Sequence, residues 1–373
     1  MLLQCAVCDR QYSLDDPRWR CDCGGYLRLL GTSAPQPSSL AARPVNLWRY
    51  SEALPDMGAP AVSLGEVLTP LTPVRYGGRE YLLKLDYLMP TGSYKDRGVA
   101  VMVNNLVKWG VSSIVEDSSG NAGASVAAYS ARAGIAADIY VPAYTSEGKI
   151  AQISLFGANL VKVPGTREDT TAAALSAGEK TFYASHNWSP FFEHGVKTYV
   201  YEIWEQMAFR MPDVIIAPCG NGSLITSAYA ALTELREAGY ISKIPRLVAV
   251  QSESCAPLAT AWSRGLDNAV PIHKGETIAE GIASARPIKG REILRAVRET
   301  GGCFVTVSDH DVWGAMQGIA RTGVFMEPTS ATAPAAAAVL AQQGFIRPSD
   351  QVVIEVTGSG LKATDKLLKL SRA

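Results

Sequence analysis

The chain has 373 residues, of which 47% are apolar and 19% charged, and its 35 basic and 35 acidic residues give a net charge of zero. This composition is typical of a globular protein with room for two domains and a large core. A surface that binds nucleic acid or an anionic membrane would need clustered Lys and Arg. We therefore expect neither partner. We find no apolar run of the roughly eighteen residues that a membrane helix needs, and the N-terminal apolar stretch is too short for a secretory signal. We therefore expect a cytoplasmic protein.

Residues 1–30 contain four of the seven cysteines, arranged as two close pairs. In a cytosolic chain such a cluster indicates a metal site rather than disulfides. The other three cysteines are scattered singly, and we expect them to be small buried hydrophobic residues. Residues 31–46 are rich in Pro, Ser and Ala and lack apolar periodicity, so they are predicted to be a linker. The clustered cysteines are Cys5, Cys8, Cys21 and Cys23.

From Leu47 onward, short apolar segments alternate with longer Ala-rich amphipathic segments. This alternation predicts an α/β fold whose parallel sheets are covered by helices on both faces. The strands form two groups, over residues 110–185 and 210–360, which predicts two lobes. Strands are expected at 81–85, 112–116, 137–142, 159–165, 213–220, 246–252 and 351–358, and prominent helices at 97–110, 122–134 and 222–239.

Three segments place glycines and small polar residues where a helix is expected to begin. They read PTGSYKDRG (90–98), SSGNAGAS (118–125) and APCGNGSL (217–224). Free backbone N–H groups and the positive end of a helix can hold an anion at such a junction. The third segment is neither a Walker loop nor a GxGxxG motif. The second and third segments, each taken alone, are equally well explained as turns that join a strand to a helix.

The second segment offers an amide from Asn121. Ser118, Ser119 and the N–H groups that follow, starting at Gly120, could cradle a carboxylate. Lys95, in the first segment, stands at an expected helix start, where the helix dipole disfavours an ammonium ion and favours the neutral amine that forms a Schiff base. A single lysine is most often a solvated surface charge. The occurrence of all three segments in this order points instead to a function.

PTGSYKDRG, SSGNAGASVAAYSARAG, GNGS and VTGSGLK together resemble the fold-type II pyridoxal-phosphate (PLP) enzymes, and most closely the threonine synthase family. The resemblance covers essentially the whole chain. It implies that Lys95 carries the cofactor as a Schiff base and that Asn121 hydrogen-bonds the cofactor's phenolic oxygen. A hydroxyl residue, Thr357, would face the pyridine nitrogen, which favours elimination and replacement over transamination. The loop that binds the cofactor phosphate would be Gly220, Asn221, Gly222 and Ser223.

The resemblance also implies a domain organisation. Residues 47–108 and 186–373 would form a large PLP domain, and residues 109–185 a small domain. Residues 1–30 resemble a zinc-ribbon-like N-terminal module, whose four cysteines would hold a structural zinc as thiolates. The second cysteine pair has one residue between its members, one fewer than the usual zinc knuckle, so a vestigial ribbon with empty or oxidised thiols is the alternative. Family members are commonly homodimers.

As a threonine synthase, the chain would convert O-phospho-L-homoserine and water to L-threonine and phosphate, with Lys95 moving the Cα and Cβ protons. Family positions for binding the substrate carry Ser93, Lys84, Ser118, Ser119, Gly120 and Lys149.

One departure bears on this substrate. Threonine synthases commonly carry N-P-[YF]-R-x-E-G, whose Asn and Arg hold the substrate phosphate. Here HNWSPFFEHG (186–195) puts Ser189 and Phe192 at those two positions. Phe lacks the planar donor fork with which Arg binds a phosphate.

Several small amino acids are therefore candidate substrates. An ammonia-lyase acting on threonine, serine or diaminopropionate needs no phosphate pocket and uses the same lysine. A β-replacement enzyme of the cysteate-synthase type is a further alternative. The sequence has no HExxH or GxSxG motif around its histidines, so a metalloprotease or hydrolase function has no support. An alternative outside the enzymes is a non-catalytic binding module built on the same scaffold.

Overall fold

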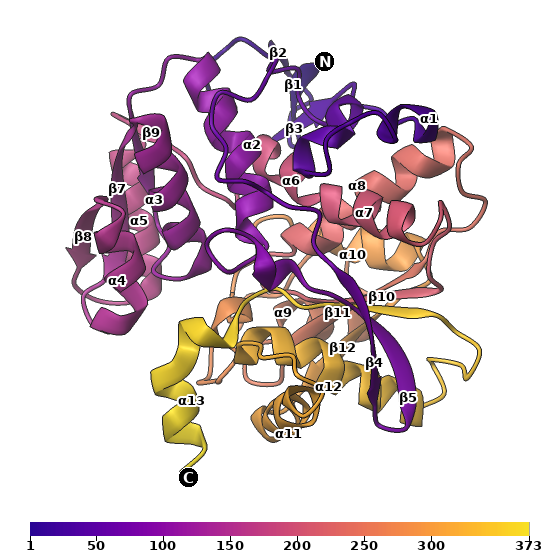
Figure 1. Ribbon diagram of the computed structural model, residues 1–373. Helices are drawn as coiled ribbons and strands as arrows, with labels where there is room; N and C mark the ends of the chain where they lie inside the picture. Colours follow the sequence, from indigo (N-terminus) through magenta and orange to yellow (C-terminus); the bar gives the residue numbers. More distant parts are fainter. Residues whose placement is uncertain (373) are drawn as a thin grey trace. The chain divides into compact units, whose positions relative to one another are not determined.

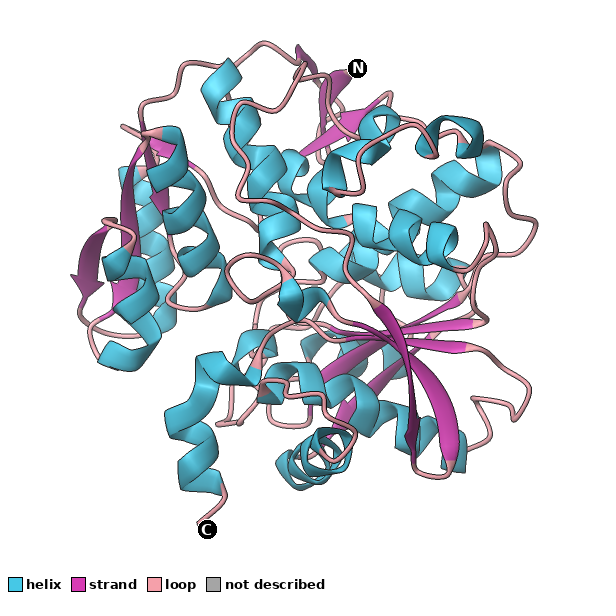
Figure 2. Ribbon diagram, in the orientation of Figure 1, coloured by secondary structure: helices cyan, strands magenta, loops and turns pink. Residues whose placement is uncertain are grey.

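The computed structural model describes residues 1–372, apart from the side chain of Lys149. The chain forms two compact units: unit 1 comprises residues 1–68 and 89–198, and unit 2 comprises residues 69–88 and 199–373. In both units strands alternate with helices along the chain, which confirms the predicted α/β class (Figure 2). Within the described residues no helix is both long and apolar enough to cross a membrane.

Unit 1 begins with a small antiparallel sheet in the order β2-β1-β3, which belongs to the cysteine-rich module. Its strands are β1 (Leu2–Cys5), β2 (Gln11–Ser13) and β3 (Leu27–Leu30). The predicted linker contains one short helix, α1 (Pro37–Leu40), and a 3-10 helix, η1 (Leu47–Ala53), follows it.

The main sheet of unit 1 is parallel throughout, in the order β8-β7-β6-β9. Helices connect its strands, as expected for parallel neighbours, which need crossover connections. The strands are β6 (Ser113–Glu116), β7 (Ala136–Pro142), β8 (Asn159–Val163) and β9 (Phe182–Tyr183), and the helices are α3 (Asn121–Ala133), α4 (Glu147–Leu155) and α5 (Arg167–Ala177).

Two further helices of unit 1, α2 (Lys95–Lys108) and α6 (Pro190–Val196), pack closely because glycines stand at their crossing. A Cβ on Gly98 would lie 2.3 Å from the Phe192 ring, and one on Gly195 would lie 2.1 Å from the carbonyl oxygen of Arg97. Helix α2 also packs on α3. These contacts group α2 and residues 186–198 with the small sheet, so the boundaries of unit 1 differ from those of the small domain expected at 109–185.

Unit 2 is built on a six-stranded sheet in the order β12-β11-β10-β13-β5-β4, in which only β4 runs antiparallel to its neighbour. Every residue of β10 is buried, as expected for a central strand covered on both faces. The strands are β4 (Leu71–Tyr76), β5 (Arg79–Lys84), β10 (Val214–Pro218), β11 (Arg246–Ser252), β12 (Cys303–Val307) and β13 (Val352–Glu355).

Helix α12 covers one face of this sheet, with α11 outside it, and α8 and α10 pack against the other face (Figure 1). Helix α7 stands at the start of the second segment of unit 2, residues 199–373. The helices are α7 (Thr198–Gln206), α8 (Ser223–Glu237), α9 (Pro257–Ser263), α10 (Gly290–Glu299), α11 (Asp309–Ala320), α12 (Pro328–Gln342) and α13 (Thr364–Leu370), with 3-10 turns η2 (Asp86–Leu88), η3 (Glu280–Ile282) and η4 (Gly360–Ala363).

The helix crossing in unit 1 predicts the effect of one methyl group. Gly195→Ala places a Cβ against a backbone oxygen that cannot rotate away, so it should cost about 1–3 kcal/mol of unfolding free energy. Gly314→Ala is the control, because Gly314 is exposed within α11 and has nothing near its Cβ position; it should gain about 0.5–1 kcal/mol. Equal midpoints for both variants in denaturant unfolding would contradict the close approach.

Candidate functional site

Each of the three glycine-rich segments ends where a helix begins, as predicted. Helix α2 starts at Lys95, α3 at Asn121 and α8 at Ser223. A helix start of this kind is a suitable place for an anion to bind. Lys95 and Asn121 lie in unit 1, and Ser223 lies in unit 2.

In unit 1 the buried carboxylate of Asp96 joins the segment before Lys95 to helix α3. Asp96 Oδ2 accepts the backbone N–H of Thr91 at 2.6 Å. Asp96 Oδ1 accepts the hydroxyls of Thr91 at 2.7 Å and of Ser125 at 2.5 Å. Because Ser125 belongs to the first two turns of α3, this carboxylate holds the helix starts that carry Lys95 and Asn121 next to each other.

Lys95 Nζ lies over two aromatic rings. It is 4.7 Å from the ring centroid of Tyr94 and 5.4 Å from that of Phe192. Phe192 is fully buried, and the absence of a side chain at Gly98 makes room for its ring. The residue that replaces the expected arginine thus contacts the lysine region of the site, where it adds an apolar surface and no positive charge.

A histidine and a glutamate lie next to Phe192. The ring centroid of His186 is 5.8 Å from that of Phe192, and His186 Nδ1 is 2.6 Å from Glu116 Oε1. Burial raises the pKa of Glu116 well above its usual range, and the charge of Asp117 adds to the effect. Burial also lowers the pKa of His186 well below its usual range, as do the charges of Lys95 and Arg167. Both directions favour a pair that is neutral overall.

The next residue, Asp117, is surrounded by donors. Its carboxylate accepts Arg167 Nη2 at 3.0 Å and the hydroxyls of Thr171 and Tyr183, each at 2.8 Å. Burial, followed by the charge of Asp117, raises the pKa of Tyr183 well above its usual range, so this phenol stays a donor. Arg167 is consequently already paired with a carboxylate.

Sequence reasoning missed Glu116, Asp117 and His186. A signal for the acids was present, because Glu116 and Asp117 are two consecutive carboxylates at the carboxyl end of an apolar strand, directly before a glycine-rich loop. Ligands of parallel α/β sheets bind at such ends. No local pattern points to His186, which is seventy residues from its partner in the chain.

In unit 2 the proposed phosphate loop and Thr357 share one edge of the sheet. Strands β10 and β13 are parallel neighbours with Ile216 opposite Ile354, and the loop of residues 220–223 and Thr357 follow their carboxyl ends. Gly222 has a φ of 78°, and a Cβ there would lie 2.3 Å from Ile293. A glycine is therefore required for the turn that opens α8, and a glycine-rich turn at a helix start is suited to binding a phosphate.

The hydroxyl of Thr357 is held in place. Thr357 Oγ1 is 2.8 Å from Ser330 Oγ, and Ser330 Oγ accepts the N–H of Gly358 at 2.8 Å. Asn221 Oδ1 accepts the hydroxyl of Ser284 at 2.9 Å. Unit 2 thus presents an oriented neutral hydroxyl and a glycine-rich helix start, which fits the groups expected around the pyridine nitrogen and the phosphate of PLP.

The residues expected to bind substrate have different environments. Ser93 is fully buried, and its hydroxyl has no hydrogen-bond partner among the described residues. Ser118 and Ser119 are partly exposed and Gly120 is exposed, so this loop is accessible. The side chain of Lys149 lies outside the described residues.

The structure argues against the expected role of Lys84. Its side chain is fully buried, and Lys84 Nζ lies 2.5 Å from Glu202 Oε2, 2.7 Å from the carbonyl oxygen of Thr69 and 3.0 Å from Gln206 Oε1. A cation held in this way is already neutralised, and exposing it would leave Glu202 buried without its partner. We correct the sequence-based expectation accordingly: Lys84 is a structural residue of unit 2.

The four N-terminal cysteines come together in space. Their sulfur atoms all lie within 4.8 Å of one another, and the Cys5–Cys23 and Cys8–Cys21 pairs are each 3.5 Å apart. Tetrahedral zinc with four thiolates would place the sulfurs about 3.8 Å apart. The donor set and its spacing therefore fit one zinc ion, despite the short spacing of the second pair.

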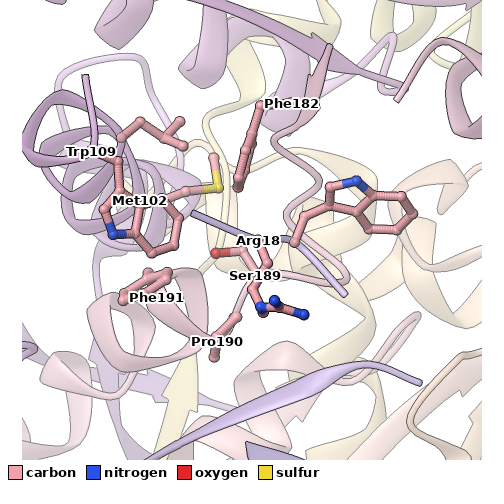
Figure 3. Close-up of a pocket in the computed structure, with 9 residues that line it drawn as sticks. Arg18, Met102, Trp109, Phe182, Ser189, Pro190 and Phe191 are labelled. Carbon is pink, nitrogen blue, oxygen red and sulfur yellow. The ribbon is translucent and has the colours of Figure 1, made fainter. Parts of the chain in front are cut away.

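A small apolar cavity lies elsewhere in unit 1, between the cysteine-rich module and helices α2 and α6 (Figure 3). Its volume is about 10 Å³, which is enough for about one water molecule. It is too small for an amino-acid substrate. The residues around it are Arg18, Trp19, Met102, Leu106, Trp109, Phe182, Ser189, Pro190 and Phe191.

The family model of the pyridoxal-phosphate dependent enzymes matches residues 62–358, which include every cofactor residue named above. The chain belongs to this family. It is 32% identical to the threonine synthase of Methanocaldococcus jannaschii, over 100% of this chain and 95% of that protein. It is 33% identical to the threonine synthase of Mycobacterium tuberculosis, over 91% of this chain and 92% of that protein.

Solved structures agree on the fold. A PLP-dependent aspartate racemase matches with a TM-score of 0.69 at 21% identity, covering 79% of this chain and 90% of its own. Threonine deaminase isoform 2 of Solanum lycopersicum matches with a TM-score of 0.68 at 22% identity, covering 82% and 88%. The predictions of family, α/β fold type and PLP dependence are confirmed.

The Asp96 network predicts a stability effect. In Asp96→Asn, an amide replaces one carboxylate oxygen and meets a donor, so a buried donor loses its acceptor at a cost of about 1–3 kcal/mol. Cofactor binding should weaken as well, because the Lys95 segment loosens. Ser125→Ala removes only one donor and should cost less, about 0.5–1.5 kcal/mol. If Asp96→Asn has the unfolding free energy and the PLP affinity of the wild type, this role of Asp96 is refuted.

Proposed function

We propose that this PLP enzyme is a threonine synthase, which converts O-phospho-L-homoserine and water to L-threonine and phosphate. The observation that carries the proposal is the 32% identity to a threonine synthase over the full chain. The similarity includes the cysteine-rich N-terminus as well as the catalytic units, since it spans 100% of the residues.

The cofactor residues divide between the two units. In unit 1, Lys95 would hold PLP as a Schiff base and Asn121 would bind its phenolic oxygen. In unit 2, residues 220–223 would bind its phosphate and Thr357 would face its pyridine nitrogen. When bound, PLP supplies an electron sink for the carbanion formed at the substrate Cα.

The remaining roles belong to the chain itself. With substrate bound, the free Nζ of Lys95 would be the base that removes the Cα proton and then a Cβ proton. Ser118, Ser119 and the N–H of Gly120, at the start of α3, would hold the substrate carboxylate. The buried, unpartnered hydroxyl of Ser93 stands two residues before Lys95 and would donate to the substrate.

A second candidate, an ammonia-lyase on an unphosphorylated amino acid, is favoured by one specific observation. Phe192 occupies the position of the phosphate-binding arginine and is fully buried. The nearby Arg167 is paired with Asp117, and Lys84 is paired with Glu202. A substrate phosphate would therefore depend on hydroxyl and backbone donors more than on cations. A β-replacement on phosphoserine would face the same restriction.

Parallel assays separate these functions. The holoenzyme is offered O-phospho-L-homoserine, threonine, serine, diaminopropionate and phosphoserine while phosphate, ammonia and amino-acid products are measured. We expect threonine and phosphate in equal amounts from the first substrate. If threonine, serine or diaminopropionate yields ammonia and O-phospho-L-homoserine yields no threonine and phosphate, the protein is an ammonia-lyase. No product from any of the five would favour a binding module.

Lys95→Ala is the matching variant. It should abolish both the visible absorbance of the lysine-bound cofactor and turnover, because no other residue is proposed to form the Schiff base. Lys108→Ala, at the exposed end of the same helix, is the control and should keep both. Turnover by Lys95→Ala at the wild-type rate would disprove the proposed site.

We further propose that Cys5, Cys8, Cys21 and Cys23 bind one structural zinc. The sulfur geometry and the four-cysteine donor set support this. The module packs on the rest of unit 1 through Trp19, whose Nε1 donates to the carbonyl oxygen of Gly178 at 3.2 Å and whose ring contacts Tyr183. A zinc ion there would stabilise the fold and take no part in the chemistry.

Metal analysis of the purified protein should find about one zinc per chain. A chelator should remove it and lower the unfolding temperature, because binding free energy contributes to folding. A zinc content near zero, with an unfolding temperature insensitive to chelator, would favour the vestigial ribbon. The homodimer stays a prediction from family resemblance, and the cytoplasmic location stays a prediction from the sequence.

A further inference from the structure

A buried glutamine lies beside the loop proposed to bind the cofactor phosphate. Gln251 stands near the carboxyl end of β11 and is fully buried. Its Nε2 donates a hydrogen bond to the carbonyl oxygen of Cys219 at 3.2 Å. Cys219 is the residue directly before Gly220, where the loop of residues 220–223 begins. The glutamine side chain therefore contacts the backbone at the entry to this loop.

The orientation of the Gln251 amide follows from its partners. Gln251 Oε1 accepts the backbone N–H groups of Leu258 at 3.0 Å and of Ala259 at 2.9 Å, both in the first turn of α9. An amide turned over would place its NH₂ group against these two donors and its oxygen against the Cys219 carbonyl. Both contacts would be repulsive, so the nitrogen faces Cys219 and the oxygen faces α9.

The bond to Cys219 also sets the direction of the next N–H group. The peptide that joins Cys219 to Gly220 is trans, and in a planar trans peptide the C=O and N–H bonds point in opposite directions. Because Gln251 holds the carbonyl on its own side, the N–H of Gly220 points away from the glutamine. This N–H is the first one of the loop, and loops of this kind bind phosphate through their backbone N–H groups.

The loop needs such a restraint because its backbone is permissive. Gly220 lacks a side chain, so the peptide on its amino side can turn over at a lower cost than it could before another residue. Two contacts already fix positions in the loop: a Cβ on Gly220 would lie 2.9 Å from the Cα of Ile282, and Asn221 Oδ1 accepts the hydroxyl of Ser284 at 2.9 Å. The bond from Gln251 fixes what these contacts leave free, which is the rotation of the peptide.

We propose that Gln251 is a positioning residue of the cofactor site, which holds the N–H of Gly220 in the direction that binds the phosphate of PLP. The inference rests on the proposed function, because that function assigns residues 220–223 to the phosphate. Gln251 acts through the Cys219 carbonyl and is not itself a ligand of the cofactor. Burying an amide costs free energy of desolvation, which an apolar residue of similar size on this apolar strand would avoid.

A simpler alternative is that Gln251 only joins α9 to the sheet. Loss of the amide would then weaken folding, and it would weaken the binding of every form of the cofactor equally. The proposed role predicts instead that the loss depends on the phosphate group, because the Gly220 N–H belongs to the phosphate loop.

Pyridoxal, which lacks the phosphate, separates the two roles. The full-length protein is freed of cofactor and titrated with PLP or with pyridoxal, while the visible absorbance of the lysine-bound aldehyde is followed. Gln251→Met has a similar size but no amide, and it should bind PLP about 10–100-fold more weakly than the wild type. Its affinity for pyridoxal should stay within a few-fold of the wild type. An equal loss for both ligands would overturn the proposal.

Gln251→Glu is a second variant, which remains informative if the methionine variant does not fold. It has the shape of glutamine and still offers Leu258 and Ala259 an acceptor, and these two N–H groups favour its ionised form. A carboxylate has no N–H to donate to the Cys219 carbonyl. At slightly alkaline pH this variant should therefore lose affinity for PLP and keep its affinity for pyridoxal. Wild-type affinity for both ligands would contradict the role of Gln251.

Thr300→Val is the matched control. The buried hydroxyl of Thr300 accepts the backbone N–H of Leu247 at 3.3 Å, near the amino end of β11. The substitution therefore removes a buried hydrogen bond to the same strand, at the end opposite to Gln251. It should lower the free energy of unfolding and leave the affinities for PLP and pyridoxal unchanged. A selective loss of PLP affinity in this variant would show that any weakening of β11 disturbs the loop, and it would overturn the specific role of Gln251.

The outcomes keep this inference separate from the proposed function. If the wild type binds PLP no more tightly than pyridoxal, the assignment of residues 220–223 to the phosphate fails, and the role of Gln251 fails with it. If the wild type prefers PLP and both Gln251 variants retain that preference in full, only the role of Gln251 fails.

Discussion

The arrangement of unit 1 depends on one buried carboxylate. Asp96 accepts hydrogen bonds from the N–H and hydroxyl of Thr91 and from the hydroxyl of Ser125, and it is the residue after Lys95. It therefore joins a loop and two helix starts that are separate in the sequence. A charge so deeply buried is tolerated because each of its bonds is charge-assisted. The result is a lysine and an asparagine, each at the first position of a helix, on one rigid support.

The chemistry next to that support is set by the lack of free positive charge. Phe192 brings an apolar ring to the lysine, Arg167 is paired with Asp117, and burial disfavours the charged forms of both His186 and Glu116. These side chains therefore do not provide strong binding of a phosphate dianion. The cofactor follows from the family match, whereas these side chains leave the substrate to be measured.

Local sequence patterns predicted the parts of the fold and site that depend on local chemistry. The helix starts at Lys95, Asn121 and Ser223 follow from glycines and small polar residues after apolar strands, and all three are present. What failed depends on long-range contacts. Lys84 meets Glu202 across 118 positions, and only the folded chain shows that the lysine is neutralised. His186 and Glu116, and the grouping of α2 with α6, likewise depend on contacts that periodicity cannot reveal.

The central claim is that Lys95 is the residue that carries PLP. Borohydride reduction fixes a cofactor bound as a Schiff base to its lysine, and peptide mass spectrometry then identifies the modified residue. We expect the reduced cofactor on the peptide that contains Lys95, with Lys84, buried against Glu202, left unmodified. A cofactor found on another lysine, or on none while the protein retains its visible absorbance, would contradict the account.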